Sequence, residues 1–358
     1  MLAGADAKSP LGGASVAAEA SVDARFALAF RKKKKCYAVP MPPAPLADTH
    51  AHLMSFWGKE PAEVIARAAL AGVRQMTTVY DPLADERDPR THAEQLREWI
   101  EGARRLLEEA GRLDAEAYPV ADPLGQDPML GRPTALLDRI GYVAGVHPYG
   151  APSYSDEVHA QVEAALDDPL CRGIGEIGLD YHFDAEDDIE AAPHDLQMEV
   201  MARQLELACA RNVPVELHVR HEADDLARTS HADAYRVLRE VGIPDAGCVL
   251  HCFGEDRATM ERFCDLGCHI AFGGAATFKR NDEVREAFAA CPLDRLLFET
   301  DCPYMAPEPL RGLECEPAMI AWTAAALTGD RSSRTGENPE DIAYAVWRNA
   351  TKLFGRRG

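Results

Sequence analysis

The feature that most constrains the fold is a regular alternation of short apolar runs with longer helical patterns from residue 45 onward. Such an alternation indicates parallel strands joined by crossover helices. Eight strand-like runs are present, at 45–52, 73–80, 142–148, 172–179, 213–219, 247–253, 268–274 and 295–301. Eight strands predict an α/β fold, a (β/α)8 TIM barrel, and 358 residues can form such a barrel as one unit.

Helical patterns separate these runs, for example at 61–72, 194–212 and 257–267. The last two end in Asn212 and Gly267, residue types that are common where helices stop. The longest gap, 81–141, exceeds what one crossover needs. It holds a helical stretch followed by a loop rich in Pro, Gly and Asp, so we interpret it as an insertion on a strand-to-helix loop.

Residues 1–44 differ in composition from the remainder of the chain. They are rich in Ala, Gly and Ser, then basic at 31–35, and then rich in proline. This composition predicts a mobile extension outside the fold, with the barrel domain spanning 45–358. The basic run is compatible with contact to nucleic acid, but a solvated tail is the commoner explanation.

Charge and cysteine content narrow the function classes. The net charge of −21 and the pI of about 5.0 disfavour a large basic docking face for duplex nucleic acid, although bound divalent cations can reverse the sign of a cleft. The ten cysteines are irregularly spaced, and Cys264 and Cys268 are interpreted as core residues. Without a membrane-span pattern or a secretory signal pattern, we expect a cytoplasmic protein that does not associate with membranes. Oligomeric state has no sequence signal.

Candidate metal ligands fall near the C-terminal ends of the expected strands, which meet at one mouth of a barrel. They are His50, His52, Glu176, His218, His251 and Asp301. A strand places residues i and i+2 on the same face, so the first two imidazoles can aim at one point. Each residue alone has a structural explanation, such as a buried histidine, a salt bridge or a turn. Six together at strand ends favour a single metal site.

The chemistry of this set suggests roles for its acids. Glu176, between Gly175 and Gly178, has room to bridge two metal ions. Two divalent ions can activate a shared water and polarise the group under attack. Asp301 is the candidate general base, with Glu176 as its catalytic partner. Imidazole and carboxylate ligands accept Zn²⁺, Mn²⁺ or Fe²⁺, with Mg²⁺ at oxygen-rich positions, so the identity of the ions stays open.

Two further residues are candidates for substrate binding. Arg220 lies two residues after His218 on the same strand face. It is placed either to bind a phosphate through two N–H groups or to form a salt bridge at the barrel rim. His147 ends the third strand before Pro148, where it either lines the pocket or supports a turn.

Seven motifs occur in a recognisable order: DTHAHL at 48–53, GVHP at 145–148, GEIGLD at 175–180, HVR at 218–220, HCF at 251–253, TDCPY at 300–304 and NATKLFG at 349–355. In this order the chain, from about residue 45 to its end, resembles the TatD family within the amidohydrolase-like barrels. The resemblance implies one metal among His50, His52, Glu176 and Asp301, and a second among Glu176, His218 and His251. It also implies Mg²⁺- or Zn²⁺-dependent removal of nucleotides from DNA ends, and Tyr304 of TDCPY is a candidate substrate contact.

The chain departs from the family pattern at a few positions. Met54 follows the first motif where Asp is common, Cys315 precedes Glu316 where Asn is common, and His221 follows HVR. The ligand motifs are intact, so these departures bear on substrate contacts. The fourth strand offers Glu176 where relatives in the wider superfamily use a modified lysine, which favours the TatD-like branch.

Four function hypotheses follow. The first is a two-metal deoxyribonuclease acting on DNA ends or short single strands. The second keeps the metals and changes the bond to an ester or amide, as in an aminoacyl-tRNA deacylase or a lactonase. The third is a catalytically silent scaffold, which predicts a lost ligand, and none is lost. The fourth is a nucleic-acid-binding module that depends on the basic extension.

Overall fold

The computed structural model describes residues 26–113, 129–182 and 191–355. Eight of its strands form one sheet, and each falls on or beside a run expected from the sequence. They are β3 (Leu46–Ala51), β4 (Val73–Tyr80), β5 (Ile140–Ala144), β6 (Cys171–Asp180), β7 (Val215–Arg220), β8 (Cys248–Leu250), β9 (His269–Phe272) and β10 (Leu296–Phe298). The predicted strand pattern is confirmed.

The strands lie in the order β10-β9-β8-β7-β6-β5-β4-β3, and every neighbouring pair is parallel. The sheet's two edges meet beyond the last strand, where Ala51 and Cys302 form a parallel bridge. The His52 N–H donates to the Cys302 carbonyl at 2.7 Å, and the Asp301 N–H donates to the His50 carbonyl at 3.0 Å. The sheet therefore closes into the expected barrel.

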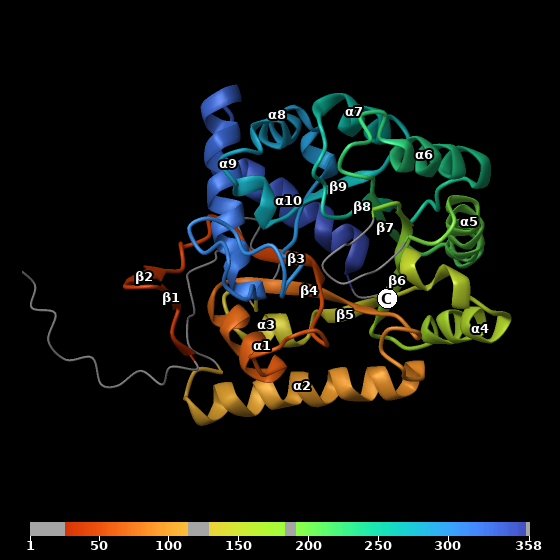
Figure 1. Ribbon diagram of the computed structural model, residues 1–358. Helices are drawn as coiled ribbons and strands as arrows, with labels where there is room; N and C mark the ends of the chain where they lie inside the picture. Colours follow the sequence, from red (N-terminus) through yellow and green to blue (C-terminus); the bar gives the residue numbers. More distant parts are fainter. Residues whose placement is uncertain (1–25, 114–128, 183–190, 356–358) are drawn as a thin grey trace, which may run out of the picture.

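One helix follows each barrel strand and returns the chain to the next. These helices are α1 (Pro61–Leu70), α2 (Pro89–Glu109), α4 (Asp156–Ala165), α5 (His194–Arg211), α6 (Thr229–Val241), α7 (Arg257–Asp265), α8 (Asp282–Ala290) and α9 (Ile320–Thr335), with the short α3 (Thr134–Leu137) before β5. Figure 1 shows them surrounding the strands in chain order, from orange through green to blue. As the sequence predicts, α5 ends at Asn212 with φ 45°, and Gly267 after α7 has φ 97°.

The final helix, α10 (Pro339–Phe354), closes the N-terminal end of the barrel. Its Trp347 and Phe354 belong to one apolar cluster with inward residues of six strands. The Gln75 side chain, near the start of β4, donates to the Ala350 carbonyl at 2.9 Å, and Asn349 donates to the Leu296 carbonyl at the start of β10. The opposite end, where the strands finish, is left for the site.

Residues 29–38, inside the expected mobile extension, instead form a hairpin of β1 (Ala29–Lys32) and β2 (Lys35–Ala38). The hairpin is anchored because the Phe30 ring packs edge-on against Trp322 at 5.7 Å and Lys32 donates to the Pro309 carbonyl at 2.8 Å. Lys33 and Lys34 at its tip are exposed. Residues 1–25 lie outside the described ranges, and the domain boundary stays a prediction.

The 81–141 segment also differs in detail from its interpretation as an insertion before a helix. Its helical stretch is α2, the crossover helix between β4 and β5 itself. Asp88 caps α2 by accepting hydrogen bonds from the Arg90 and Thr91 N–H groups, each at 3.0 Å. The extra length therefore falls mainly between α2 and β5, on the helix-to-strand side. Residues 114–128 of the expected loop lie outside the described ranges.

Two other expectations concern cysteines and membranes. All ten cysteines are free thiols. Cys268 is buried in the main core and Cys264 packs against that core, as expected. Among the helices within the described ranges, none offers the length of apolar sequence that spanning a bilayer requires.

A buried ion cluster ties the start of the barrel to its end. Glu316 is fully buried and accepts hydrogen bonds from Lys59 at 2.6 Å and from Arg67 of α1 at 2.7 and 3.0 Å. Both partners are largely buried. One carboxylate thus holds the segment before α9 against α1.

We expect Glu316→Ala to lower the free energy of unfolding by about 3–5 kcal/mol, because removing one member of a buried ion cluster leaves desolvated charge behind. Chemical denaturation followed by circular dichroism measures the change. Glu94→Ala is the matched control, because its i,i+4 pair with Arg90 is exposed and solvent screens the interaction. Equal effects of the two substitutions would contradict the prediction.

Candidate metal centre

The structure brings together all six side chains that the sequence selected, at the C-terminal mouth of the barrel. One group surrounds the ends of β3 and β10. The His50 and His52 Nε2 atoms are 2.9 Å apart, and Asp301 Oδ1 lies 3.8 and 3.4 Å from them. Ligand atoms of these three residues all lie within 4.8 Å of one another. The HxH motif therefore does aim both rings at one point.

The second group surrounds the ends of β7 and β8. His218 Nδ1 lies 2.7 Å from Glu176 Oε1, His251 Nε2 lies 2.9 Å from the same oxygen, and the two nitrogens are 3.3 Å apart. The other carboxylate oxygen, Glu176 Oε2, faces the first group, at 3.7 Å from His50 Nε2 and 3.8 Å from His52 Nε2. Each oxygen of Glu176 thus faces a different pair of imidazoles.

Glycines in β6 allow the close strand approach that sets this geometry. A Cβ on Gly178, which has φ 143°, would lie 2.0 Å from the His218 carbonyl oxygen. A Cβ on Gly175 would lie 2.8 Å from Glu216 Cβ. The sequence interpretation gave these glycines the task of leaving room around Glu176. Their contacts show that they bring the backbone of β6 against β7, so that the Glu176 carboxylate meets His218.

Three buried carboxylates contact the far nitrogens of these histidines, and the sequence interpretation missed all three. Glu216 Oε2 lies 3.1 Å from His50 Nδ1, Glu299 Oε1 lies 3.6 Å from His251 Nδ1, and Asp180 Oδ2 lies 3.0 Å from His218 Nε2. An acid within an apolar strand, two positions before a candidate ligand, was the available signal for Glu216 and Glu299. Carboxylates in this position orient histidines that ligate metals.

The electrostatics of the centre favour positive charge. Burial opposes ionisation of Glu176, but the charge of His251 and the hydrogen bond with His218 outweigh it and hold the Glu176 pKa well below its usual value. Burial also opposes protonation of His251, yet the charges of Glu176 and Glu299 raise its pKa well above the usual value. Burial lowers the pKa of His50 to about 3, which leaves this ring in its neutral, ligand-competent form.

Asp301 is held at the rim by the barrel closure. Its backbone has φ 54°, a left-handed conformation that is costly for a residue with a side chain and that clusters at functional sites. Burial opposes its ionisation, but contact with His52 outweighs this effect and lowers the Asp301 pKa, so the group is a carboxylate at neutral pH. The Cys252 thiol lies 3.5 Å from Asp301 Oδ2 and donates to it.

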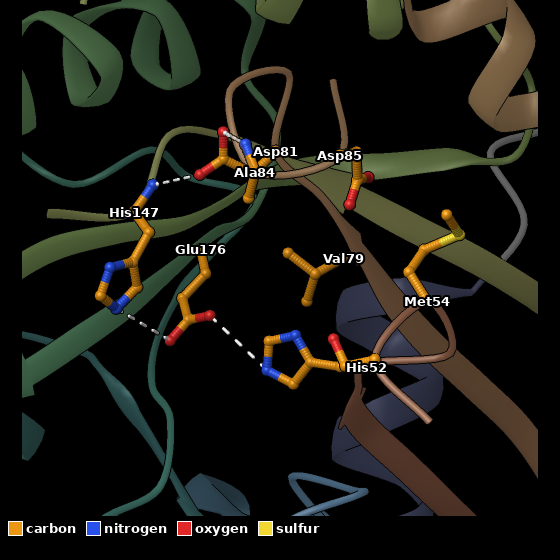
Figure 2. A pocket seen from close by; sticks show the side chains of 9 residues that line it. His52, Met54, Val79, Asp81, Ala84, Asp85, His147 and Glu176 are labelled. Atoms are coloured by element: carbon orange, nitrogen blue, oxygen red, sulfur yellow. Dashed lines mark hydrogen bonds and ion pairs between the residues drawn. The ribbon is translucent and has the colours of Figure 1, made fainter. Parts of the chain in front are cut away.

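His147 lines the pocket beside Glu176, and Figure 2 shows its ring pointing toward that carboxylate opposite His52. His147 Nδ1 accepts a hydrogen bond from the backbone N–H of Tyr149 at 3.2 Å. The backbone N–H of His147 donates to the Asp81 carboxylate at 2.9 Å. Because Nδ1 is an acceptor, Nε2 of the neutral ring carries the hydrogen. That atom lies 3.9 Å from Glu176 Oε1, and burial lowers the ring's pKa to about 3.

Arg220 forms the rim salt bridge that the sequence left open as one of its two roles. Its Nε donates to both oxygens of Asp180 at 3.0 Å, and Nη2 contacts the Tyr149 hydroxyl. Since Asp180 also contacts His218, Arg220 is joined to the candidate centre through this shared acid. Its side chain is partly exposed at the mouth, so a phosphate contact stays a prediction.

Tyr304 lies at the mouth next to the first group of ligands. The centroid of its ring lies 5.8 Å from that of His52, in an edge-on arrangement, and 6.4 Å from that of Trp57, in a tilted one. Trp57 is 66% exposed and Tyr304 48% exposed, which is unusual for such large rings. The sequence interpretation missed Trp57, because a lone aromatic residue in a loop has no pattern that would distinguish it.

Comparison with known proteins agrees with this geometry. Residues 47–355 match the family model described as TatD related DNase. An uncharacterized metal-dependent hydrolase TatD of Mycobacterium tuberculosis is 30% identical over 314 residues, which are 87% of this chain and 98% of that protein. A 3′-5′ ssDNA/RNA exonuclease TatD of Pantoea vagans is 32% identical over 217 residues, 59% of this chain and 76% of that protein.

Among solved structures, YJJV, a TatD homologue from Escherichia coli, superimposes with a TM-score of 0.62 at 25% identity. The match covers 88% of this chain and all of the other. The metal-dependent chemistry of the relatives fits the clustered imidazoles and carboxylates at the barrel mouth. The chain belongs to the TatD-related DNase family, and it is a metal-dependent hydrolase.

Proposed function

We propose that this hydrolase cleaves phosphodiester bonds at the ends of single-stranded nucleic acid, using two divalent ions. The observation that carries the proposal is the two-sided contact of Glu176, one oxygen toward His50 and His52 and the other toward His218 and His251. A carboxylate placed between two imidazole pairs is the arrangement expected of a bridging ligand in a two-metal site.

The donor set fits divalent cations. His50, His52, Glu176 and Asp301 would hold one ion, and Glu176, His218 and His251 would hold the other. Nitrogen and oxygen donors of this kind suit Zn²⁺ or Mn²⁺, with Mg²⁺ possible where oxygen prevails. The ions would supply Lewis acidity toward a phosphoryl oxygen and would lower the pKa of water.

The chain's own side chains account for the remaining steps. Asp301, a carboxylate at neutral pH, accepts the proton of the attacking water and returns it to the leaving oxygen. His147 donates its Nε2–H toward an oxygen of the phosphate, because its Nδ1 is engaged by the backbone. Arg220, oriented by Asp180, offers a cation to the same group.

Exposed aromatic rings favour an unpaired strand as the substrate. Tyr304 lies beside His52 and Trp57 lies beside Tyr304, so the base next to the cleaved bond can stack on these rings. The net charge of −21 disfavours binding of a duplex along its backbone, whereas a strand end can enter the mouth where the candidate ligands would hold the cations. The name of the Pantoea vagans relative, an exonuclease of single-stranded DNA and RNA, supports the same class of substrate.

We expect metal-loaded protein to release nucleotides from end-labelled single-stranded DNA or RNA faster than from duplex, and Asp301→Asn to lower the rate about 10²- to 10⁴-fold by removing the proton acceptor. Oligonucleotides labelled at the 3′ or the 5′ end, resolved on gels, measure rate and polarity. Asp294→Asn, at an exposed position, is the control. If no nucleotide is released with Mg²⁺, Mn²⁺ or Zn²⁺ while ester or lactone substrates are hydrolysed, the proposed nuclease function is wrong. The alternative, an ester or amide hydrolase, then takes its place.

Glu216→Leu keeps the volume of the buried side chain but removes the acid beside His50 Nδ1. We expect metal affinity to fall about 10- to 100-fold, as loss of such supporting carboxylates does elsewhere. Competition with a chromophoric chelator measures the affinity. Glu206→Leu, at an exposed position on the outer helix α5, provides a control with the same change of side chain. An unchanged affinity in Glu216→Leu would remove the orienting role.

Trp57→Ala should raise KM for single-stranded oligonucleotides by the equivalent of about 1–3 kcal/mol, because base stacking on an aromatic ring contributes about that much. We expect kcat to change less, since the Trp57 ring packs against Tyr304 and Trp57 is not one of the candidate ligands. Trp57→Phe should restore most of the affinity. Steady-state kinetics on a short oligonucleotide gives both constants, and an unaltered KM in Trp57→Ala would contradict a stacking role.

A further inference from the structure

A second group of metal-ligating side chains lies beside the candidate centre and shares no residue with it. His221 follows β7 directly, Glu255 lies in the loop after β8, and His231 lies in α6. His221 Nδ1 is 3.3 Å from Glu255 Oε1, and His231 Nε2 is 3.9 Å from the same oxygen. Ligand atoms of the three all lie within 4.8 Å of one another.

These separations fit ligands around one ion. Zinc–nitrogen and zinc–oxygen distances of about 2.0–2.2 Å in a tetrahedron place neighbouring ligand atoms roughly 3.4 Å apart. The His231 separation from Glu255 is too long for a hydrogen bond. His221 Nδ1 is buried and has no partner with hydrogen-bond geometry among the described residues, although Glu255 is near. The positions of His221 Nδ1, His231 Nε2 and Glu255 Oε1 therefore suit three ligands of one ion better than a set of direct hydrogen bonds.

Glu255 is held so that one oxygen stays available. Arg228 binds Glu255 Oε2 through its Nε, on the opposite side of the carboxylate from the imidazoles. The same guanidinium pairs with Asp256 at 3.0 Å. One Arg228 cation is thus matched by two carboxylates, and the local charge without a metal stays negative.

His231 has the protonation state that a ligand needs. Its side chain is almost fully buried, and burial lowers its pKa to about 3, so the ring is neutral. Its Nδ1 lies 3.4 Å from the Ser230 hydroxyl. The remaining nitrogen, Nε2, is the one that faces Glu255. The ring therefore directs its second nitrogen toward the point shared with His221.

We propose that His221, His231 and Glu255 form a further binding site for a zinc-class divalent cation, with one coordination position left open. Three protein ligands with an open fourth position are the arrangement of sites that also bind water or a substrate group. The site lies at the same end of the barrel as the candidate centre, and it would add positive charge there in a chain of net charge −21. The proposal does not depend on the substrate inferred above.

The test isolates this site by removing the other one. In the double variant His50→Ala/His251→Ala, stripped with chelator and reloaded with Co²⁺ or Zn²⁺, we expect about one ion to remain bound per chain. Adding His221→Asn or Glu255→Gln should remove that ion and the visible Co²⁺ absorption bands. Adding Asp256→Asn, which alters a partner of Arg228 and no ligand, should leave both unchanged.

Metal content is measured by mass spectrometry after desalting, and circular dichroism verifies that each variant is folded. His221 is partly exposed, so the His221→Asn substitution tests the site without opening the core. A folded double variant that binds no ion would overturn the proposal, as would equal metal content with and without His221→Asn. Loss of nuclease activity alone would not, because activity belongs to the other centre.

Discussion

The site depends on closure of the barrel between its first and last strands. Residues more than two hundred positions apart meet there through backbone hydrogen bonds from Asp301 to His50 and from His52 to Cys302. The buried Asp48 reinforces the seam by accepting hydrogen bonds from the Thr300 N–H at 2.9 Å and the Thr300 hydroxyl at 2.6 Å. Without this seam, the HxH motif and the candidate base would have no fixed relation to each other.

Closure alone does not complete the centre, because Glu176 must also reach histidines of two other strands. Glycines in β6 permit that approach, and carboxylates on the outer side of the rings fix the ring orientations. Two of these acids, Asp180 and Glu299, also raise the pKa of His218 and His251, so they stabilise positive charge inside a buried cluster. The candidate ligands and their supports therefore act as one electrostatic unit, in which the field of the acids favours a cation before any substrate arrives.

Under the proposed function, an acidic protein of net charge −21 would act on a polyanion, and it would need positive charge placed locally. Cations held by the candidate ligands would provide it at the mouth, and the exposed rings of Trp57 and Tyr304 would offer bases a surface without charge. A cation at the cluster of His221, His231 and Glu255 would extend the same principle along the rim.

Local sequence patterns were enough to predict the eight strands, the barrel and the six candidate ligands, because strand periodicity and polar residues at strand ends can be recognised from neighbouring residues alone. The hairpin at 29–38, the three supporting acids and the Trp57 platform came only from the tertiary structure. In the sequence, an acid such as Glu216 looks the same whether it supports a candidate metal ligand or forms an ordinary salt bridge. Only its neighbour in the fold distinguishes the two roles, and that neighbour, His50, is far away in sequence. Long-range packing decides such contacts, and no local pattern records them.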